Sequence, residues 1–163
     1  MANEGLELAG KHMGIVVDNA DPLKLGRLKI RVLEAYGEQS GEVLPWAWPC
    51  FAYGGMPQMA LYVVPEVGAG VWVEFMWKDG QPDATHPVWT GSWLAEGETP
   101  SQVAGSAEDA HYYKVFKTTS GHFLTFCDKP GEEFIRLEDK NESYILLKEG
   151  RIFIHAPAEI NET

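Results

Sequence analysis

The sequence is poor in the features that mark secreted, membrane-spanning and metal-binding proteins. Its 163 residues include two cysteines, Cys50 and Cys127, and no CxxC pair, so it has neither a zinc ribbon nor a redox motif. No apolar run approaches the roughly 18 residues that a membrane-spanning helix needs. The first ten residues carry Glu4 and Glu7 and lack the basic flank and apolar core of a signal peptide. We therefore expect a protein that stays in the cytoplasm where it is made.

Positive charge is scarce. The chain has 13 lysines and arginines against 24 aspartates and glutamates, for a net charge of −11. A protein that binds nucleic acid needs a basic stripe, because its affinity grows with the number of phosphates that it neutralises. The basic cluster Lys24, Arg27, Lys29 and Arg31 alternates with apolar residues, as on the solvent-facing side of a strand. Nucleic acid and anionic membrane surfaces are therefore poor partners.

Motifs of catalysis and metal binding are also lacking. The nearest approach to a phosphate-binding loop ends in Gly10-Lys11-His12, where a histidine replaces the Ser or Thr that holds magnesium. No Gly-x-Ser-x-Gly elbow and no His-x-x-x-His pair occurs. Carboxylate pairs such as Asp79 and Asp83 fall in turn segments, without a cleft that would shift their pKa values. We expect no enzyme activity, no cofactor and no metal site.

Short alternating strands are what the sequence does contain. Five β-branched or aromatic runs, separated by turn signals, lie at residues 12–17, 27–32, 59–64, 71–77 and 87–93. This pattern predicts an all-β fold that begins with a small closed barrel of five strands, of the OB type. The six tryptophans are expected mainly in the barrel core, although some could instead form a seal between subunits.

Composition divides the chain into three parts. Residues 1–95 hold the expected barrel, and residues 96–112 are small, polar and acidic, as in a linker. In residues 113–163 short strands recur about every ten residues, at 121–128, 133–139, 144–148 and 151–155. An antiparallel meander within one chain would give the same spacing.

Each of these repeated strands offers only two or three apolar residues on one face. The expected inward residues are Leu124, Phe126, Ile135, Leu137, Ile145, Leu147, Ile152 and Ile154. Strands with so small a core need neighbours to bury it. Other copies of the same chain would supply those neighbours. The repeats therefore predict an intertwined oligomer whose core holds these eight residues.

The order and spacing of several runs resemble a known family. Asn19, Asp21 and Pro22 are followed by Leu-Gly-Arg-Leu-Lys-Ile at 25–30, and further runs lie at 46–49, 65–75, 86–92 and 117–122. Together they resemble the central spike proteins of contractile phage tail baseplates, a family related to baseplate assembly protein V and to type VI secretion spikes. The resemblance covers nearly the whole chain, and it lies in the order of the runs more than in one motif.

The resemblance implies a structural protein of the virion. Its members form homotrimers in which an OB-type barrel is followed by an intertwined trimeric β-helix or prism. Such a spike caps the tail tube in the baseplate, contacts tail tube and hub proteins, and meets the host envelope transiently as it pierces it. Some relatives carry a lysozyme domain, for which residues 96–112 are too short. No His-x-His pair marks a metal-binding tip, so either the chain is truncated or a separate tip protein caps the needle.

Two alternatives remain. The chain could be the spike of a type VI secretion system or of another phage-derived contractile injection system. It could also be a ligand-binding module, because OB barrels hold single strands or sugars on aromatic platforms. The acidic charge disfavours nucleic acid as the ligand. A cell-wall hydrolase, suggested only by the family association, lacks its catalytic domain.

Overall fold

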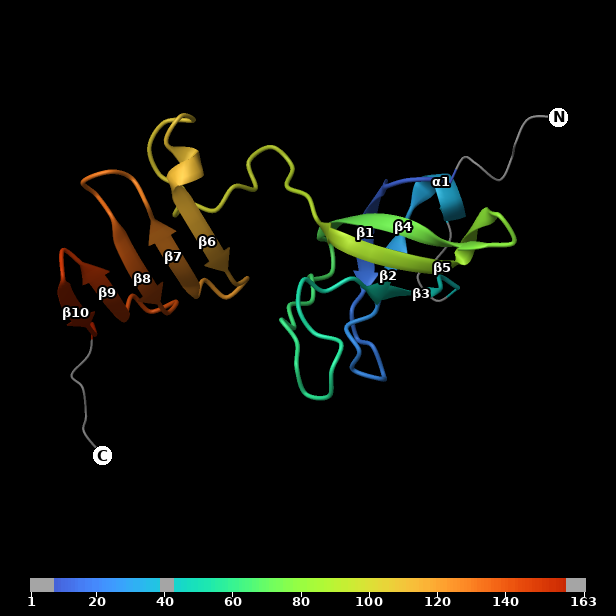
Figure 1. Ribbon diagram of the computed structural model, residues 1–163, viewed down its shortest axis with the longest axis horizontal. Coiled ribbons are helices and arrows are strands. Elements are labelled where there is room, and N and C mark those ends of the chain that lie inside the picture. The colour runs from blue at the N-terminus through green and yellow to red at the C-terminus, as the bar shows by residue number, and fades with distance from the viewer. Residues whose placement is uncertain (1–7, 39–42, 158–163) are drawn as a thin grey trace. The chain divides into compact units, whose positions relative to one another are not determined.

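The computed structural model describes residues 8–38 and 43–157 and confirms an all-β protein. Its only helical elements in these ranges are α1 (Leu33–Tyr36) and a 3-10 turn at Ala110–Tyr112. The chain forms two compact units, Met1–Ala95 and Glu96–Thr163 (Figure 1). Each unit is built around its own β-sheet.

Five strands of the first unit close into a barrel in the order β1-β2-β3-β5-β4. Their bounds are β1 (His12–Asp18), β2 (Leu28–Arg31), β3 (Trp46–Pro49), β4 (Gly70–Lys78) and β5 (Gln81–Ser92). β3 and β5 pair in parallel, and the other neighbours are antiparallel. A five-stranded closed barrel of this kind is the OB type that the sequence predicts.

Alternation along the barrel strands builds its core. The buried cluster comprises Val16, Leu28, Ile30, Val32, Ala47, Val71, Val73, Phe75 and Trp89. Glycine is required where the wall is tightest, because a Cβ at Gly14 would overlap Ile30 and one at Gly70 would overlap the Trp93 ring. The barrel therefore has a continuous apolar interior without room for added side chains at these two points.

Two expectations about the barrel are wrong. Residues 59–64 are not a strand: they lie in the long connection from β3 to β4, and Leu61 and Tyr62 are exposed. The fifth strand of the barrel is instead β3, which the five predicted runs do not include. Its Ala47 is buried between two outward tryptophans. Of the six tryptophans only Trp89 is buried, because the others lie on outward positions or at strand ends.

A buried ion pair shapes the connection between β1 and β2. The Asp21 carboxylate accepts backbone hydrogen bonds from Leu23 at 3.0 Å and Leu25 at 2.8 Å, and Arg27 Nη2 donates to it at 2.6 Å. The turn then passes through Gly26, whose φ of 77° favours glycine. These bonds explain in physical terms why this segment carries an aspartate and an arginine six residues apart.

The second unit is a five-stranded antiparallel meander in the order β10-β9-β8-β7-β6. Its strands are β6 (Tyr113–Lys117), β7 (Phe123–Cys127), β8 (Phe134–Glu138), β9 (Tyr144–Lys148) and β10 (Arg151–His155). The sequence indicates the last four and misses β6. All four strand pairings are made within one chain, so interleaving with strands of other copies is not needed to form the sheet.

Turn chemistry accounts for this pairing within the chain. Glu149 and Gly150 join β9 to β10 with φ values of 52° and 71°, the arrangement of a two-residue hairpin turn. Between β8 and β9, the Asp139 carboxylate accepts hydrogen bonds from the backbone of Asn141 and Ser143, both at 2.9 Å. Local turns of this kind hold consecutive strands of one chain next to each other.

The segment 96–112, expected to be a linker, belongs to the second unit. The Asp128 backbone amide donates to the Tyr112 carbonyl at 3.0 Å. Lys129 lies 3.5 Å from the Asp109 carboxylate, and Lys117 Nζ donates to Ser101 Oγ at 3.1 Å. The segment is therefore hydrogen-bonded to the sheet at several points along its length.

Candidate functional site: an exposed apolar face of the second sheet

The strand register of the second sheet aligns apolar side chains in two rows across it. One row pairs Phe116, Leu124, Leu137, Ile145 and Ile154 in turn from β6 to β10. The other row runs from Lys114 through Phe126, Ile135, Leu147 and Ile152. Residues that pair directly across a sheet lie on the same face. All eight residues predicted from the sequence therefore lie on one face, and Phe116 adds a ninth that the sequence did not reveal.

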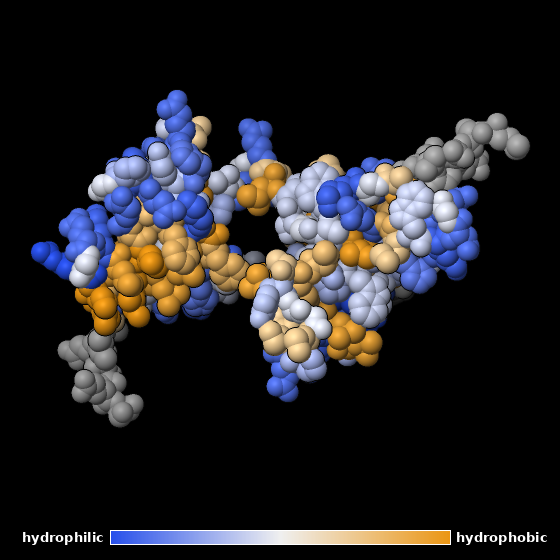
Figure 2. Space-filling model, viewed as in Figure 1, coloured by the Kyte–Doolittle hydropathy of each residue, from blue (hydrophilic) through white to orange (hydrophobic). Residues whose placement is uncertain are grey.

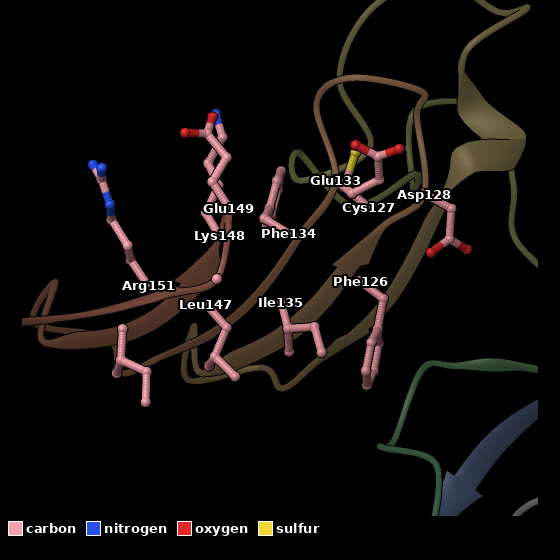
Figure 3. Close-up of a pocket in the computed structure, with 12 residues that line it drawn as sticks. Phe126, Cys127, Asp128, Glu133, Phe134, Ile135, Leu147, Lys148, Glu149 and Arg151 are labelled. Atoms are coloured by element: carbon pink, nitrogen blue, oxygen red, sulfur yellow. The ribbon is translucent and has the colours of Figure 1, made fainter.

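We call these nine side chains of the second sheet the apolar face. Figure 3 shows Phe126, Ile135 and Leu147 side by side on neighbouring strands, projecting to the same side of the sheet, while Lys148 and Arg151 project to the other. Much of the apolar face is open to solvent: Ile152 is 69% exposed and Ile154 is 70% exposed. Hydrophobic residues gather on one side of this sheet (Figure 2). Uncovered contiguous surfaces of this kind mark sites of association.

The opposite face of the sheet is mixed: charged and aromatic side chains lie beside apolar ones, and it contains the buried residues Thr125 and Cys127. Arg136 forms an ion pair with Glu138, and its guanidinium carbon lies 4.1 Å from the centre of the Tyr144 ring. That ring stacks on His155, with 5.0 Å between the ring centres. Phe153 is an apolar member of this face. The two faces thus differ, because the opposite face holds ion-paired and buried side chains, whereas none of the nine residues of the apolar face is buried.

Charge distribution also sets the apolar face apart. Among the described residues, its two rows contain one charged side chain, Lys114, at the β6 edge. Lys114 Nζ lies 2.5 Å from the Asp128 carboxylate, which partly neutralises it. No acidic side chain stands in either row, although the chain as a whole carries −11. Copies of this acidic protein can therefore approach through this face without placing carboxylates opposite one another.

A second polar cluster of the barrel unit, besides Asp21 and Arg27, lies on β5. Asp83 Oδ2 lies 2.7 Å from His86 Nδ1, and Thr85 Oγ1 donates to Asp83 Oδ1 at 2.6 Å. The hydrogen bonds from Thr85, with a smaller contribution from His86, lower the pKa of Asp83 to about 2. Because His86 Nδ1 also lies 2.9 Å from Thr85 Oγ1, one ring nitrogen meets both partners and cannot relay a proton between them. The cluster is a hydrogen-bonded turn.

Two other kinds of site are absent from the described ranges. No group of three or more His, Cys, Asp or Glu side chains in residues 8–38 and 43–157 is arranged to hold a metal ion. Within the same ranges, no helix has the length and apolar content to cross a bilayer. The apolar face is thus the feature of the second unit that calls for a functional explanation.

The fold and this face define a class of β-rich proteins in which an OB-type barrel is followed by an antiparallel sheet with one exposed apolar face. The chain belongs to the type VI secretion system/phage-baseplate injector OB domain family, whose model matches residues 12–94, half of the chain. Comparison with curated proteins gives no match. The family match confirms the resemblance to baseplate spike proteins and gives the barrel a structural role of the baseplate type. The second sheet lies outside the matched residues.

Proposed function

We propose that this chain is the central spike subunit of a contractile phage tail, a homotrimer that caps the tail tube in the baseplate and helps to pierce the host envelope. The observation that carries the proposal is the apolar face, joined to a barrel of the baseplate family. Its role is mechanical, without catalysis, and its place is the tail of the virion.

The energetics of the sheet favour several copies. Two inward side chains per strand contribute at most about 3–6 kcal/mol when they are fully buried. Ordering a five-residue strand costs about 5–10 kcal/mol of backbone entropy. A sheet with this face in water therefore lacks the burial that would stabilise it. Three sheets with their apolar faces turned inward would form a three-sided prism that buries all three faces.

In such a prism each strand level makes one layer of the core. Ile145 and Leu147 of β9 would meet the same residues of two other copies, and the next layer would bring together Ile152 and Ile154 of β10. The opposite faces, with Arg136 and its partners, would point outward. The eight residues predicted from the sequence would then be the trimer core of the needle.

The ends of the proposed spike suggest its other partners. β10 is the last strand of the meander, and its outer edge has no strand partner within the described residues. An edge of this kind can take up further strands or a capping protein. We assign it to a separate tip protein, and we assign contacts with tail tube and hub proteins to the barrel end. Contact with the host envelope would be transient.

The alternative is the spike of a type VI secretion system or of another phage-derived contractile injection system. The description of the matching family names both machines, and a trimeric prism would serve either. The identity of the neighbouring genes distinguishes the phage tail from the secretion system, because the sheath and tube genes of the two machines lie beside different sets of genes.

The test of the proposal is the molar mass of the purified full chain by light scattering. A trimer gives three times the chain mass of 18.1 kDa. Two sheets could instead pack face to face in a dimer, because that arrangement also covers an apolar face. A mass of one or two chains therefore contradicts the proposal.

A further inference from the structure

The outer side of the barrel carries two tryptophans on one short strand. Trp46 and Trp48 flank the buried Ala47 in β3, so both indoles stand on the outward side of the sheet. Trp48 is 50% exposed, although an indole is among the side chains that gain most from burial. On the neighbouring strand β2, Lys29 pairs directly with Trp46. We call Trp46 and Trp48, with Arg27 and Lys29 beside them, the indole platform.

Two cations hold the rings of the indole platform in place. The Arg27 guanidinium carbon lies 5.6 Å from the Trp46 ring centre and 5.5 Å from that of Trp48. Lys29 Nζ lies 5.3 Å from the Trp46 ring centre. Contacts at these distances are attractive cation–π interactions. Arg27 is itself fixed, because its Nε and Nη2 both donate to the Asp21 carboxylate. The platform is thus ordered before a ligand arrives, which lowers the entropy cost of binding.

Polar side chains follow on the other strand that flanks β3. Trp48 pairs in parallel with Val88 of β5, and the next outward residue along β5 is His86, beyond the buried Pro87. The His86 side chain is 59% exposed, and its Nδ1 lies 2.7 Å from Asp83 Oδ2. Among the described residues His86 Nε2 has no hydrogen-bond partner. The strand beside Trp48 therefore offers a hydrogen-bonding group to a ligand on the outer side of the barrel.

Charge narrows the class of ligand that fits this surface. The charge of Arg27 is neutralised by Asp21, and the chain as a whole carries −11, so an anion gains little here. A cation would meet Arg27 and Lys29, which already lie over the rings. The remaining class is an uncharged ligand with a flat apolar face and polar groups at its edge. A sugar ring combines both, because its C–H groups stack on an indole while its hydroxyls form hydrogen bonds.

We propose that the indole platform binds an uncharged oligosaccharide, with one sugar ring stacked on Trp48. OB barrels place oligosaccharides on this face, formed by their second and third strands. Residues two apart on a strand are separated by about 7 Å, so the two indoles together span one or two sugar rings. The proposal goes beyond the structural role of the chain, since it depends neither on the trimer nor on the second sheet.

The test uses the purified full chain with three neutral probes of different linkage: maltohexaose, cellohexaose and chitohexaose. Saturation-transfer NMR detects the bound sugar, and quenching of tryptophan fluorescence gives its Kd. We expect at least one of the three to bind with a Kd in the millimolar range or below. Because the ligand is uncharged, its Kd should be the same at low and at physiological salt.

The chain supplies a matched control for the platform. Trp48→Ala should weaken binding of that sugar by about tenfold or more, the scale of one lost stacking contact with an aromatic ring. Trp77→Ala removes an indole of β4 that is 58% exposed and lies outside the platform, so it should bind the sugar as the wild type does. Both rings are exposed, so the barrel should remain folded, and the melting temperature of each variant checks this.

Three results would overturn the proposal. One is the absence of saturation transfer to all three sugars. Another is an equal loss of binding in Trp48→Ala and Trp77→Ala, which would mean that sugars contact exposed indoles without selection. The third is a hexaproline peptide that binds through Trp48 more tightly than every sugar, because aromatic surfaces also recognise extended proline-rich segments. The molar mass of the chain is measured separately, so each of these outcomes leaves the spike proposal standing.

Discussion

At the scale of the residue, the β1–β2 turn depends on one carboxylate. The Asp21 side chain is 2% exposed, and five hydrogen bonds reach it from the backbone of Leu23, Leu25 and Arg27 and from the Arg27 guanidinium. The hydrogen bonds from Arg27 hold the pKa of Asp21 well below its usual range, and burial opposes them only in part. A neutral side chain could not replace a charge that is buried in contact with a cation.

Asp21→Asn should therefore destabilise the barrel by roughly 3 kcal/mol, the low end for breaking a buried pair. Because the folded-state pKa is depressed, the stabilisation is fully present above the unfolded value of about 3.9 and is lost as pH falls below it. Urea unfolding at neutral pH and at about pH 3 measures both effects, and the variant should show a smaller loss of stability on acidification. Asp18→Asn is the control, since the half-buried Asp18 side chain accepts a hydrogen bond from the Ala20 amide that an amide oxygen can also accept.

At the scale of the element, the sequence reveals strands where alternation is complete and misses them where it is not. β4 carries Val71, Val73 and Phe75 on its buried side, so its period is plain. β6 was missed because Lys114 and Phe116 share one face while Tyr113 and Lys117 share the other. Neither face of β6 is uniformly apolar, so its pairing with β7 is what makes it a strand.

Continuous apolar runs cause the opposite error, in which a strand is predicted where none forms. Residues 59–64 have the composition of a buried strand, yet they lie in the connection from β3 to β4, where Leu61 and Tyr62 are exposed. Composition does not distinguish a segment buried in its own core from one held for a partner. In the second unit the alternation placed all eight predicted residues on one face of the sheet, because successive side chains of a strand point to opposite faces.

The second sheet allows a direct comparison between substitutions on its apolar face and a substitution on its opposite face. Leu137→Asp or Ile145→Asp should abolish the trimer, because each would place three unpaired charges in one layer of the core. Phe153→Ser is the matched control: it lies on the opposite face and is about as exposed as Ile145. Light scattering reports the assembly. A trimeric Ile145→Asp, or a Phe153→Ser that dissociates equally, would show that the inward face has been misassigned.

At the scale of the whole molecule, the two units differ in how much they bury. The buried apolar residues of the described ranges lie almost all in the first unit, and in the second only Thr125 and Cys127 are buried. The barrel is also closed, so it leaves no long sheet edge. All six tryptophans lie in residues 46–93, so fluorescence reports on the barrel alone.

A fragment ending at Gly97 should therefore fold by itself, with a cooperative melting transition followed by tryptophan fluorescence. Its melting temperature should lie within a few degrees of the barrel transition in Ile145→Asp, because both have a barrel without a needle trimer. An unfolded fragment beside a folded full chain would mean that the barrel depends on the second unit.

The charge of the proposed trimer bears on whether the barrel binds nucleic acid, as some OB barrels do. The outer surface of β2 and β3 does carry an aromatic platform: Arg27 lies 5.5 Å from the Trp48 ring centre, and Lys29 lies 5.3 Å from that of Trp46. Arg27, however, is bound to Asp21, which removes one of the cations from phosphate binding.

We therefore expect binding of single-stranded DNA no stronger than background at physiological salt, measured by fluorescence anisotropy with a labelled oligothymidine. Three chains at −11 carry −33, a long-range repulsion that a few cations on the β2–β3 surface cannot offset. Residual binding at low salt should fall steeply as salt is added and should fall further in Trp48→Ala, because a half-exposed ring can stack one base. Submicromolar affinity at physiological salt would contradict this expectation and favour a ligand-binding role for the barrel.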